Sequence, residues 1–235
     1  MPSATAPTDQ PAARSTSPPT PAQPPTPHPR KADALTTPSA TSLAAEREAR
    51  GAGAVVVLDD EVHAARWVRK AHSTNPGAFA SPGTGPLGHV VEGRVRMLPT
   101  APRHAPLQAG GDPGRLEAAR VALHVVTLED DGAQLEELGT THAGLVIAGF
   151  GVGYVPDVLA PRLGALAEHM PVVLTSRTGS GSVLRHTYNA PGSETDLRRR
   201  GLIDGGFLDP YKARSCSRCF WRQEQGATTS RKRLR

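Results

Sequence analysis

Two glycine-rich loops carry the residue pattern most typical of ligand binding. They read GFGVG at 149–153 and SRTGSGS at 176–182, and each follows a short apolar run. Glycines let a backbone approach a pyrophosphate, and the next helix would offer its amino end to the charge. The dinucleotide motif needs its third glycine after two residues, whereas Gly153 follows after one and Pro156 opens the next helix. The spacing therefore favours a tight turn over a phosphate site.

The two cysteines, Cys216 and Cys219, form a single C-x-x-C pattern. Such a pair can be half of a zinc site or a redox pair. Zinc needs two further ligands, and the nine histidines show no H-x-H or H-x-x-x-H spacing. A thioredoxin-like pair would stand at the amino end of a helix that follows a strand, a context that the sequence lacks here. We therefore predict no metal site and no cofactor.

Positive charge is concentrated at the carboxyl end. The chain of 235 residues has a formal net charge of +5, and residues 212–235 hold eight Lys or Arg against Glu224. This segment contributes +7, which leaves −2 for the rest of the chain. Nucleic-acid binding through such a tail would be non-specific and salt-sensitive. We predict no specific nucleic-acid partner, and binding through the tail remains one of three functional hypotheses.

The elements that would position these residues begin with an apolar run, AVVVL at 54–58, which predicts a buried strand. The acidic residues at 59–61 are typical of a helix amino terminus, and residues 62–68 would give that helix an apolar face. Lys70 would lie at or beyond the helix end, where composition alone indicates a surface charge. Residues 89–98 predict a hairpin that turns at Glu92 and Gly93.

The second half of the chain predicts a βαβαβ series. Strands are expected at 121–128, 144–148 and 172–174, with helices at 131–138 and 158–167. A right-handed βαβ unit would open both glycine loops on the same edge of one sheet. Residues 99–118 are rich in proline and glycine and indicate a linker, so two α/β lobes follow.

The amino-terminal segment has the composition of an unpacked chain. Its first forty residues hold 11 of the 23 prolines, and no aromatic residue precedes Trp67. We predict disorder over residues 1–45. No apolar region of signal-peptide length and no run of about 20 apolar residues occurs, so we expect no secretory signal, no membrane partner and a cytoplasmic protein.

Four blocks now identify a resemblance. They read VVVLDDEVHAARWVRKAHSTNPGAFASPGTGPLGHVVEGRV, AGLVIAGFGVGYVP, PVVLTSRTGSGSV and GLIDGGFLDPYKAR. Their order and spacing resemble the bacterial-type L-asparaginase (asparaginase/glutaminase) family over about residues 48–214. The resemblance implies a two-lobed α/β asparaginase-like fold. Residues 48–98 would be the remnant of an incomplete amino-terminal catalytic lobe, and residues 119–214 the smaller βαβ carboxyl-terminal lobe.

The resemblance implies hydrolysis of L-asparagine, or more weakly of L-glutamine, through a threonine nucleophile and an acyl-enzyme. An alcohol is a poor nucleophile at neutral pH, so a nearby base must take its proton. In the family a buried lysine does this, kept neutral by desolvation. Lys70 falls on that position, so the resemblance reverses the interpretation from composition and implies a catalytic residue.

Two substrate-binding positions are also implied. In the family, an asparagine and a glutamate from a neighbour's smaller domain complete each active site, so the resemblance implies a homo-oligomer, a dimer or a tetramer. Glu194 occupies the glutamate position and would contact a substrate amino group, with a solvated loop acid as the alternative. Tyr154 stands where the asparagine would be.

The chain departs from the family at both ends. The T-G-G-T-I-type nucleophile segment and the later T-D-T segment are not found, so the catalytic threonines and aspartate are unassigned. The loss of pattern suggests that a change of reading frame wrote residues 1–47 and the basic tail at 215–235. An inactive, truncated or frame-shifted asparaginase-like protein is therefore the alternative to an active amidohydrolase.

Overall fold

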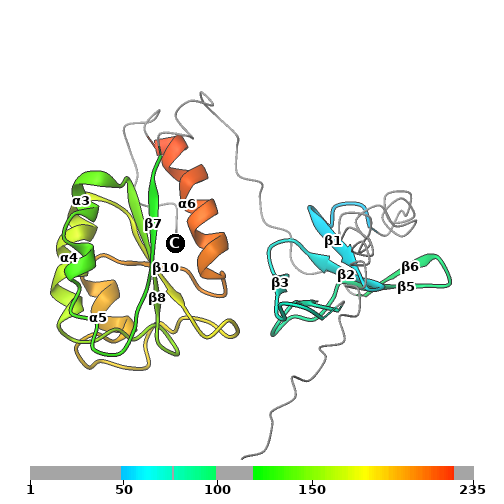
Figure 1. The fold of residues 1–235 in the computed structure, drawn as a ribbon, viewed down its shortest axis with the longest axis horizontal. Coiled ribbons are helices and arrows are strands. Elements are labelled where there is room, and N and C mark those ends of the chain that lie inside the picture. Colours follow the sequence, from blue (N-terminus) through cyan, green and yellow to red (C-terminus); the bar gives the residue numbers. More distant parts are fainter. Residues whose placement is uncertain (1–48, 76, 99–118, 225–235) are drawn as a thin grey trace, which may run out of the picture.

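The structure is a computed structural model that describes residues 49–75, 77–98 and 119–224. These residues form an amino-terminal lobe of strands, 49–98, and a carboxyl-terminal α/β lobe, 119–224 (Figure 1). The predictions for residues 1–45 and for the linker lie outside the described residues. The strands of the amino-terminal lobe are β1 (Val55–Leu58), β2 (Glu61–Ala64), β3 (Arg69–Lys70), β4 (Phe79–Ala80), β5 (Gly88–Val91) and β6 (Arg94–Met97).

The amino-terminal lobe contains two small antiparallel sheets. One has the strand order β1-β2-β5-β6, and the other is the ribbon of β3 and β4. A small apolar core lies on the first sheet and includes Val62, Leu87 and Val95, all buried. The predicted hairpin is confirmed as β5 and β6, and Glu92 and Gly93 have φ of 52° and 75°. Both residues lie in the left-handed region that a two-residue hairpin turn requires.

The helix predicted after residue 58 is wrong. The chain instead turns at Asp59 and Asp60, whose φ values are 51° and 59°, and returns as β2 antiparallel to β1. Aspartate tolerates the left-handed conformation better than most residues, so an Asp-Asp pair can make a tight hairpin turn. The acidic residues interpreted as a helix start are this turn, and the predicted apolar face is divided between β2 and the turn after it.

The carboxyl-terminal lobe is built on a four-stranded parallel sheet with the order β10-β9-β8-β7. Helices α3, α4 and α5 cover one face of the sheet, and α6 covers the face toward the amino-terminal lobe (Figure 1). The elements are β7 (Val121–Val125), the short 3-10 helix η2 (Ala133–Leu135), α3 (Leu138–Thr141), β8 (Gly144–Gly149), α4 (Leu159–His169), β9 (Val172–Ser176), α5 (Glu194–Arg199), β10 (Ile203–Asp204) and α6 (Pro210–Glu224). The predicted βαβαβ order is confirmed.

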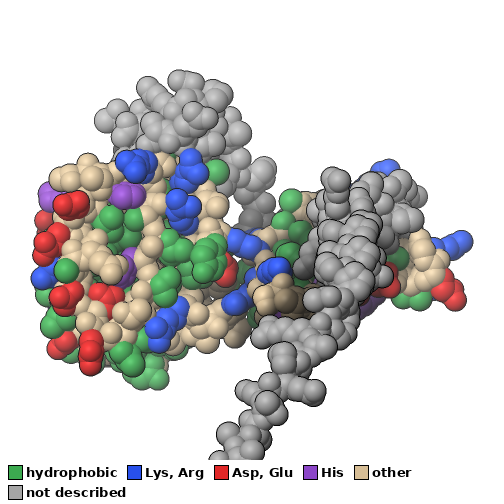
Figure 2. Space-filling model, viewed as in Figure 1, with side chains coloured by type: hydrophobic (Ala, Val, Ile, Leu, Met, Phe, Trp, Pro, Cys, Tyr) green, Lys and Arg blue, Asp and Glu red, His purple; other side chains and the backbone are tan. Residues whose placement is uncertain are grey.

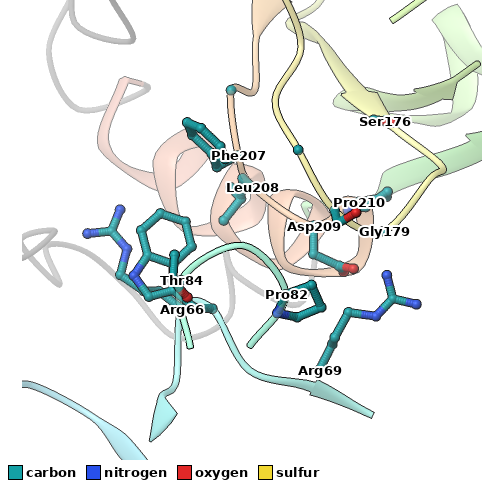
Figure 3. A pocket seen from close by; sticks show the side chains of 14 residues that line it. Arg66, Arg69, Pro82, Thr84, Ser176, Gly179, Phe207, Leu208, Asp209 and Pro210 are labelled. Carbon is teal, nitrogen blue, oxygen red and sulfur yellow. The ribbon is translucent and has the colours of Figure 1, made fainter. Parts of the chain in front are cut away.

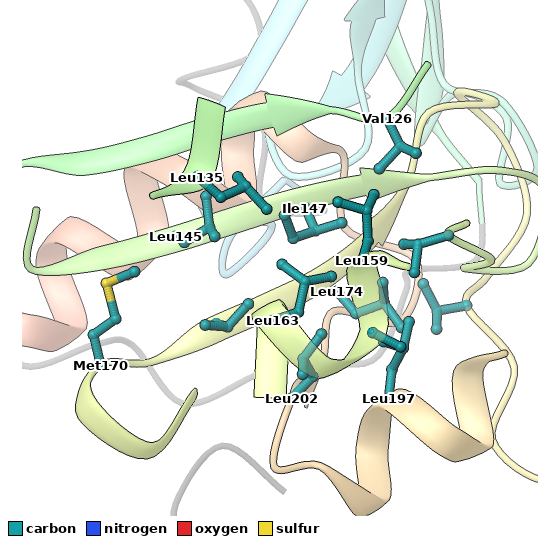
Figure 4. Close-up of a cluster of buried hydrophobic side chains, with 14 residues drawn as sticks. Val126, Leu135, Leu145, Ile147, Leu159, Leu163, Met170, Leu174, Leu197 and Leu202 are labelled. Carbon is teal, nitrogen blue, oxygen red and sulfur yellow. The ribbon is translucent and has the colours of Figure 1, made fainter. Parts of the chain in front are cut away.

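The main core lies between this sheet and α4 (Figure 4). Leu159 and Leu163, predicted to lie on the apolar face of α4, are fully buried against Ile147 and Leu174. Burial of each such side chain contributes roughly 1.5–3 kcal/mol to the free energy of unfolding. Val158, predicted on the same face, precedes the helix and is 57% exposed. The carboxyl ends of β8 and β9 are thus held by a continuous apolar core.

Helix α6 continues past Arg214, where the predicted family segment ends, to Glu224. Its arginines hold the start of β7, because Arg214 Nε donates to the carbonyl oxygen of Val121 (2.8 Å) and Arg218 Nε to that of Ala119 (3.2 Å). Within the described residues, no helix has the length and apolar character needed to cross a membrane.

Candidate functional site

The two glycine-rich loops meet at the carboxyl edge of the parallel sheet. Gly149 at the end of β8 pairs with Ser176 at the end of β9, and the Arg177 N–H donates to the Gly149 carbonyl oxygen (2.9 Å). The Ser176 hydroxyl crosses to the carbonyl oxygen of Gly151 (2.5 Å). The prediction that both loops open on one edge is confirmed.

The GFGVG loop is a closed turn that presents Tyr154. The Phe150 N–H donates to the Tyr154 carbonyl oxygen (2.7 Å), and a Cβ on Gly149 would lie 2.7 Å from that oxygen. Gly153 has a φ of +112°, and its own Cβ would lie 3.1 Å from Leu174 and Val183. Close packing of the turn on itself and on the core explains these glycines, as the tight-turn interpretation requires.

Glu194 is the central group of this edge. It is the first residue of α5, and its side chain is fully buried. Oε1 accepts the backbone N–H groups of Thr187 (3.0 Å) and Tyr188 (2.8 Å). Oε2 is also buried and has no hydrogen-bond partner among the described residues. A carboxylate fixed through one oxygen, with the other unpaired, is suited to accept hydrogen bonds from a cation.

Two tyrosines flank this carboxylate. The rings of Tyr154 and Tyr188 meet edge to face, with centroids 5.4 Å apart. Burial raises the pKa of Tyr154, and the negative charge of Glu194 raises it further, so the phenol stays neutral at physiological pH. The structure thus brings together the two sequence-predicted binding residues, Tyr154 and Glu194. It adds Tyr188, which lies in a loop whose sequence carries no motif that would have indicated it.

Lys70 lies in the other lobe, on the short strand β3, opposite Phe79 of β4. Its side chain is exposed, whereas the resemblance implies a buried lysine. Among the described residues, it has no hydrogen bond or ion pair with Tyr154 or Glu194. A single chain therefore does not unite the three predicted site residues.

A polar network centred on the buried His63 fixes the ribbon that carries Lys70. His63 on β2 is 1% exposed, and its ring lies 3.0 Å from the Ser81 hydroxyl through Nδ1 and 3.0 Å from the Glu61 carboxylate through Nε2. Because the carboxylate accepts, we assign the proton to Nε2, so that the Ser81 hydroxyl donates to Nδ1. Ser81 directly follows β4, so this network ties the ribbon to β2. This network was not predicted, because Glu61 and His63 were expected on a helix and not on a strand.

A pocket lies where the two lobes meet (Figure 3). Arg69 and Trp67 line it from the amino-terminal lobe, and Gly179, Phe207 and Asp209 from the carboxyl-terminal lobe. The Arg69 guanidinium packs directly on Gly179, because a Cβ there would lie 1.6 Å from Nη1. Figure 2 shows Lys and Arg side chains along this boundary, and it shows Asp and Glu side chains at the outer edges of both lobes; Asp209 in the pocket is an acidic residue at the boundary itself.

A second ionisable pair lies at the end of β7. His124 Nε2 is 2.6 Å from Asp130 Oδ2, and Asp130 Oδ1 accepts the Gly132 N–H (3.0 Å). Burial alone would raise the pKa of Asp130, but the hydrogen bonds from His124 and Gly132 outweigh it and lower that pKa below its usual value. The pair holds the β7–η2 connection.

The cysteines lie inside α6, not at its amino end. Burial raises the pKa of the Cys216 thiol, the neighbouring Cys219 adds to the shift, and Arg66 opposes it. A thiol with a raised pKa stays protonated at neutral pH and is a poor nucleophile. The described part of the chain also holds no group of three or more His, Cys, Asp or Glu side chains placed to bind a metal ion.

The chain matches two known family models, one in each lobe. A family model described as the amino-terminal domain of asparaginase matches residues 20–103, and one described as the glutaminase/asparaginase carboxyl-terminal domain matches residues 120–232. The chain belongs to the asparaginase/glutaminase family. Both matches extend beyond residues 48–214, the range on which the resemblance rests.

Individual members of the asparaginase family agree with this assignment. An L-asparaginase of Bacillus licheniformis is 30% identical over 179 residues, and L-asparaginase 2 of Escherichia coli is 28% identical over 181 residues. These matches cover 74% and 75% of this chain but 53% and 50% of those relatives. The chain thus spans about half the length of the curated relatives it matches.

The fold agrees with a solved asparaginase structure. The probable cytoplasmic L-asparaginase of Campylobacter jejuni superimposes with a TM-score of 0.66 at 26% sequence identity. That match covers 83% of this chain and 58% of the other. The two-lobed α/β asparaginase-like fold is therefore confirmed.

Proposed function

We propose that this asparaginase-family chain hydrolyses L-asparagine to L-aspartate and ammonia, with Glu194 binding the substrate ammonium and Lys70 acting as the base. The observation that carries the proposal is the unpaired, fully buried Oε2 of Glu194, held in place through the two N–H groups on Oε1. An amino-acid ammonium supplies the donors that such an oxygen lacks. Membership of an amidohydrolase family supplies the reaction class.

The proposed reaction has two steps. A threonine hydroxyl, not yet assigned, attacks the side-chain amide carbon while Lys70 takes its proton. The C–N bond then breaks, the proton passes to the leaving nitrogen, and ammonia departs from an acyl-enzyme ester. Water attacks this ester in the second step, releases L-aspartate and restores the hydroxyl. L-Glutamine, one methylene longer, would be the weaker substrate.

We further propose that two copies of the chain form each site. Lys70 and Glu194 lie on different lobes without mutual contact, so one copy would place its β3 against the Tyr154 and Glu194 edge of another. A dimer or a tetramer satisfies this requirement. A cytoplasmic location is also a proposal, and it is supported by the similarity to the probable cytoplasmic L-asparaginase of Campylobacter jejuni.

One observation favours a second candidate, a catalytically inactive asparaginase-like scaffold. Lys70 is exposed, and a lysine must be desolvated or placed near another cation to be neutral at physiological pH. Without a neutral base, the chain would retain the binding edge around Glu194 but not the chemistry.

The test is ammonia release from L-asparagine by the purified full chain, the Lys70→Ala variant and a matched control. Arg96→Ala serves as the control because Arg96 is an exposed cation on β6. Saturable release that Lys70→Ala abolishes and Arg96→Ala retains supports the hydrolase. Release that survives in Lys70→Ala refutes the role of Lys70, and no release from folded wild type supports the inactive scaffold.

A further inference from the structure

The chain makes a single helical turn between β2 and the strand that carries Lys70. The N–H groups of Trp67 (2.9 Å) and Val68 (3.0 Å) both donate to the Ala64 carbonyl oxygen. The carbonyl groups at the carboxyl end of such a turn have no donor within the turn, so they attract a cation from elsewhere. The next two residues are Arg69 and Lys70, which form β3.

The cation comes from the other lobe. Lys212, on the first turn of α6, directs its ammonium at the carbonyl oxygens of Ala65 (2.6 Å) and Val68. Trp67 of the same turn packs edge to face on Phe207, with ring centroids 6.4 Å apart. The turn is therefore held from the carboxyl-terminal lobe by a polar contact and an aromatic one.

Lys212 makes these carbonyl contacts in place of an ion pair. Burial lowers its pKa, with partial opposition from Asp209. In the part of the chain that the structure describes, no carboxylate lies within ion-pair distance of its ammonium. The half-buried ammonium donates to two carbonyl oxygens. Such charge-assisted hydrogen bonds are stronger than hydrogen bonds between neutral groups.

We infer that Lys212 is a positioning residue for Lys70: its ammonium joins the two carbonyl groups before β3 and fixes that strand relative to α6. The inference rests on the proposed function for the role of Lys70. The His63 and Ser81 network holds the ribbon from the β4 side, and Lys212 holds it from the β3 side. The first residues of α6 therefore set where the proposed base stands.

The test compares Lys212→Met, which keeps the side-chain length but removes the donors, with Lys212→Arg, which keeps the charge. Arg214→Met is the matched control, because Arg214 lies on the same helix and donates to a carbonyl of its own lobe. The first readout is trypsin cleavage after Arg66, Arg69 and Lys70, relative to cleavage after Arg94 and Arg96 in the β5–β6 hairpin. We expect Lys212→Met to accelerate cleavage in the turn about ten-fold, with no change in the hairpin.

The second readout is the kinetics of ammonia release. If the wild type is active, Lys212→Met lowers kcat per folded molecule with little change in KM, and Lys212→Arg restores kcat; expressing kcat per folded molecule, with the folded fraction measured by circular dichroism, removes the contribution of a merely destabilised fold. If Lys212→Met does not fold, Lys212→Leu, which also removes the donors, replaces it. Turn cleavage at the wild-type rate in the Met or Leu variant overturns the inference. Absence of ammonia release by the wild type overturns the proposed function instead, and the cleavage ratio still tests the positioning.

Discussion

Replacing Glu194 with glutamine separates its place in the fold from its proposed contact with substrate. Glutamine has the same shape, and its amide oxygen can accept the N–H groups of Thr187 and Tyr188 as Oε1 does. Its amide nitrogen would then take the place of Oε2, the oxygen that has no partner among the described residues. The variant presents a donor where the wild type presents an acceptor.

The two effects have different sizes. In Glu194→Gln, the hydrogen bonds to the neutral amide are weaker, which lowers the free energy of unfolding, but a buried charge is removed, which raises it. Because these effects oppose each other, we expect a net change of only about 1 kcal/mol. Glu194→Ala leaves both N–H groups unsatisfied, at about 1–3 kcal/mol each. Loss of one charge-assisted contact with a ligand ammonium costs about 1.5–3 kcal/mol, or roughly ten- to a hundred-fold in Kd.

Calorimetric titration with L-aspartate and with succinate measures this contact, because succinate lacks the ammonium. Glu194→Gln should weaken L-aspartate binding by that factor and leave succinate binding unchanged. Glu137→Gln, at an exposed position before α3, is the matched control and should bind both ligands as the wild type does. Equal losses for the two ligands, or undiminished L-aspartate affinity, would refute the assignment of Oε2 to an ammonium.

Two further predictions concern stability. Because the folded-state pKa of Asp130 is lowered, its stabilisation is present above the unfolded pKa of about 3.9 and is lost as pH falls through the lower folded value. Urea unfolding should show Asp130→Asn to be less stable than wild type at pH 7 by about 1.5–3 kcal/mol. The difference should shrink toward pH 3, and a constant difference would contradict the linkage. Gly149→Ala should lower the free energy of unfolding by about 1–3 kcal/mol, since its Cβ would lie 2.7 Å from the Tyr154 carbonyl oxygen; wild-type urea stability would contradict the closed turn.

The carboxyl-terminal lobe could be predicted from sequence because its signals agree with one another. Buried parallel strands give continuous apolar runs, as at 144–148, and α4 repeats Leu159, Leu163 and Leu166 at helical spacing. In the amino-terminal lobe, acidic residues after an apolar run fitted both a helix start and a hairpin turn. Asp59 and Asp60 adopt left-handed conformations, which form the hairpin turn. No local sequence pattern predicts these conformations.

The site divides in the same way. Tyr154 and Glu194 could be named only through the family resemblance, by their distance from the glycine loop and from the GLIDGGFLDP block, and their roles in substrate binding stay predictions. The contacts of Tyr188 with Tyr154 and of His63 with Ser81 join separate segments of the chain, which periodicity does not encode. Lys212 is the extreme case, because its acceptors lie 144 and 147 residues away.

The two lobes therefore hold their proposed functional groups by different means. Glu194 stands beside a parallel sheet whose core is continuous and is fixed by two backbone hydrogen bonds within its own lobe. Lys70 stands on a two-residue strand whose place depends on a histidine from β2 and a lysine from α6. Local opening costs least where few apolar contacts are lost. Loss of either contact would therefore displace the proposed base while the carboxylate stays in place, and substrate binding would outlast turnover.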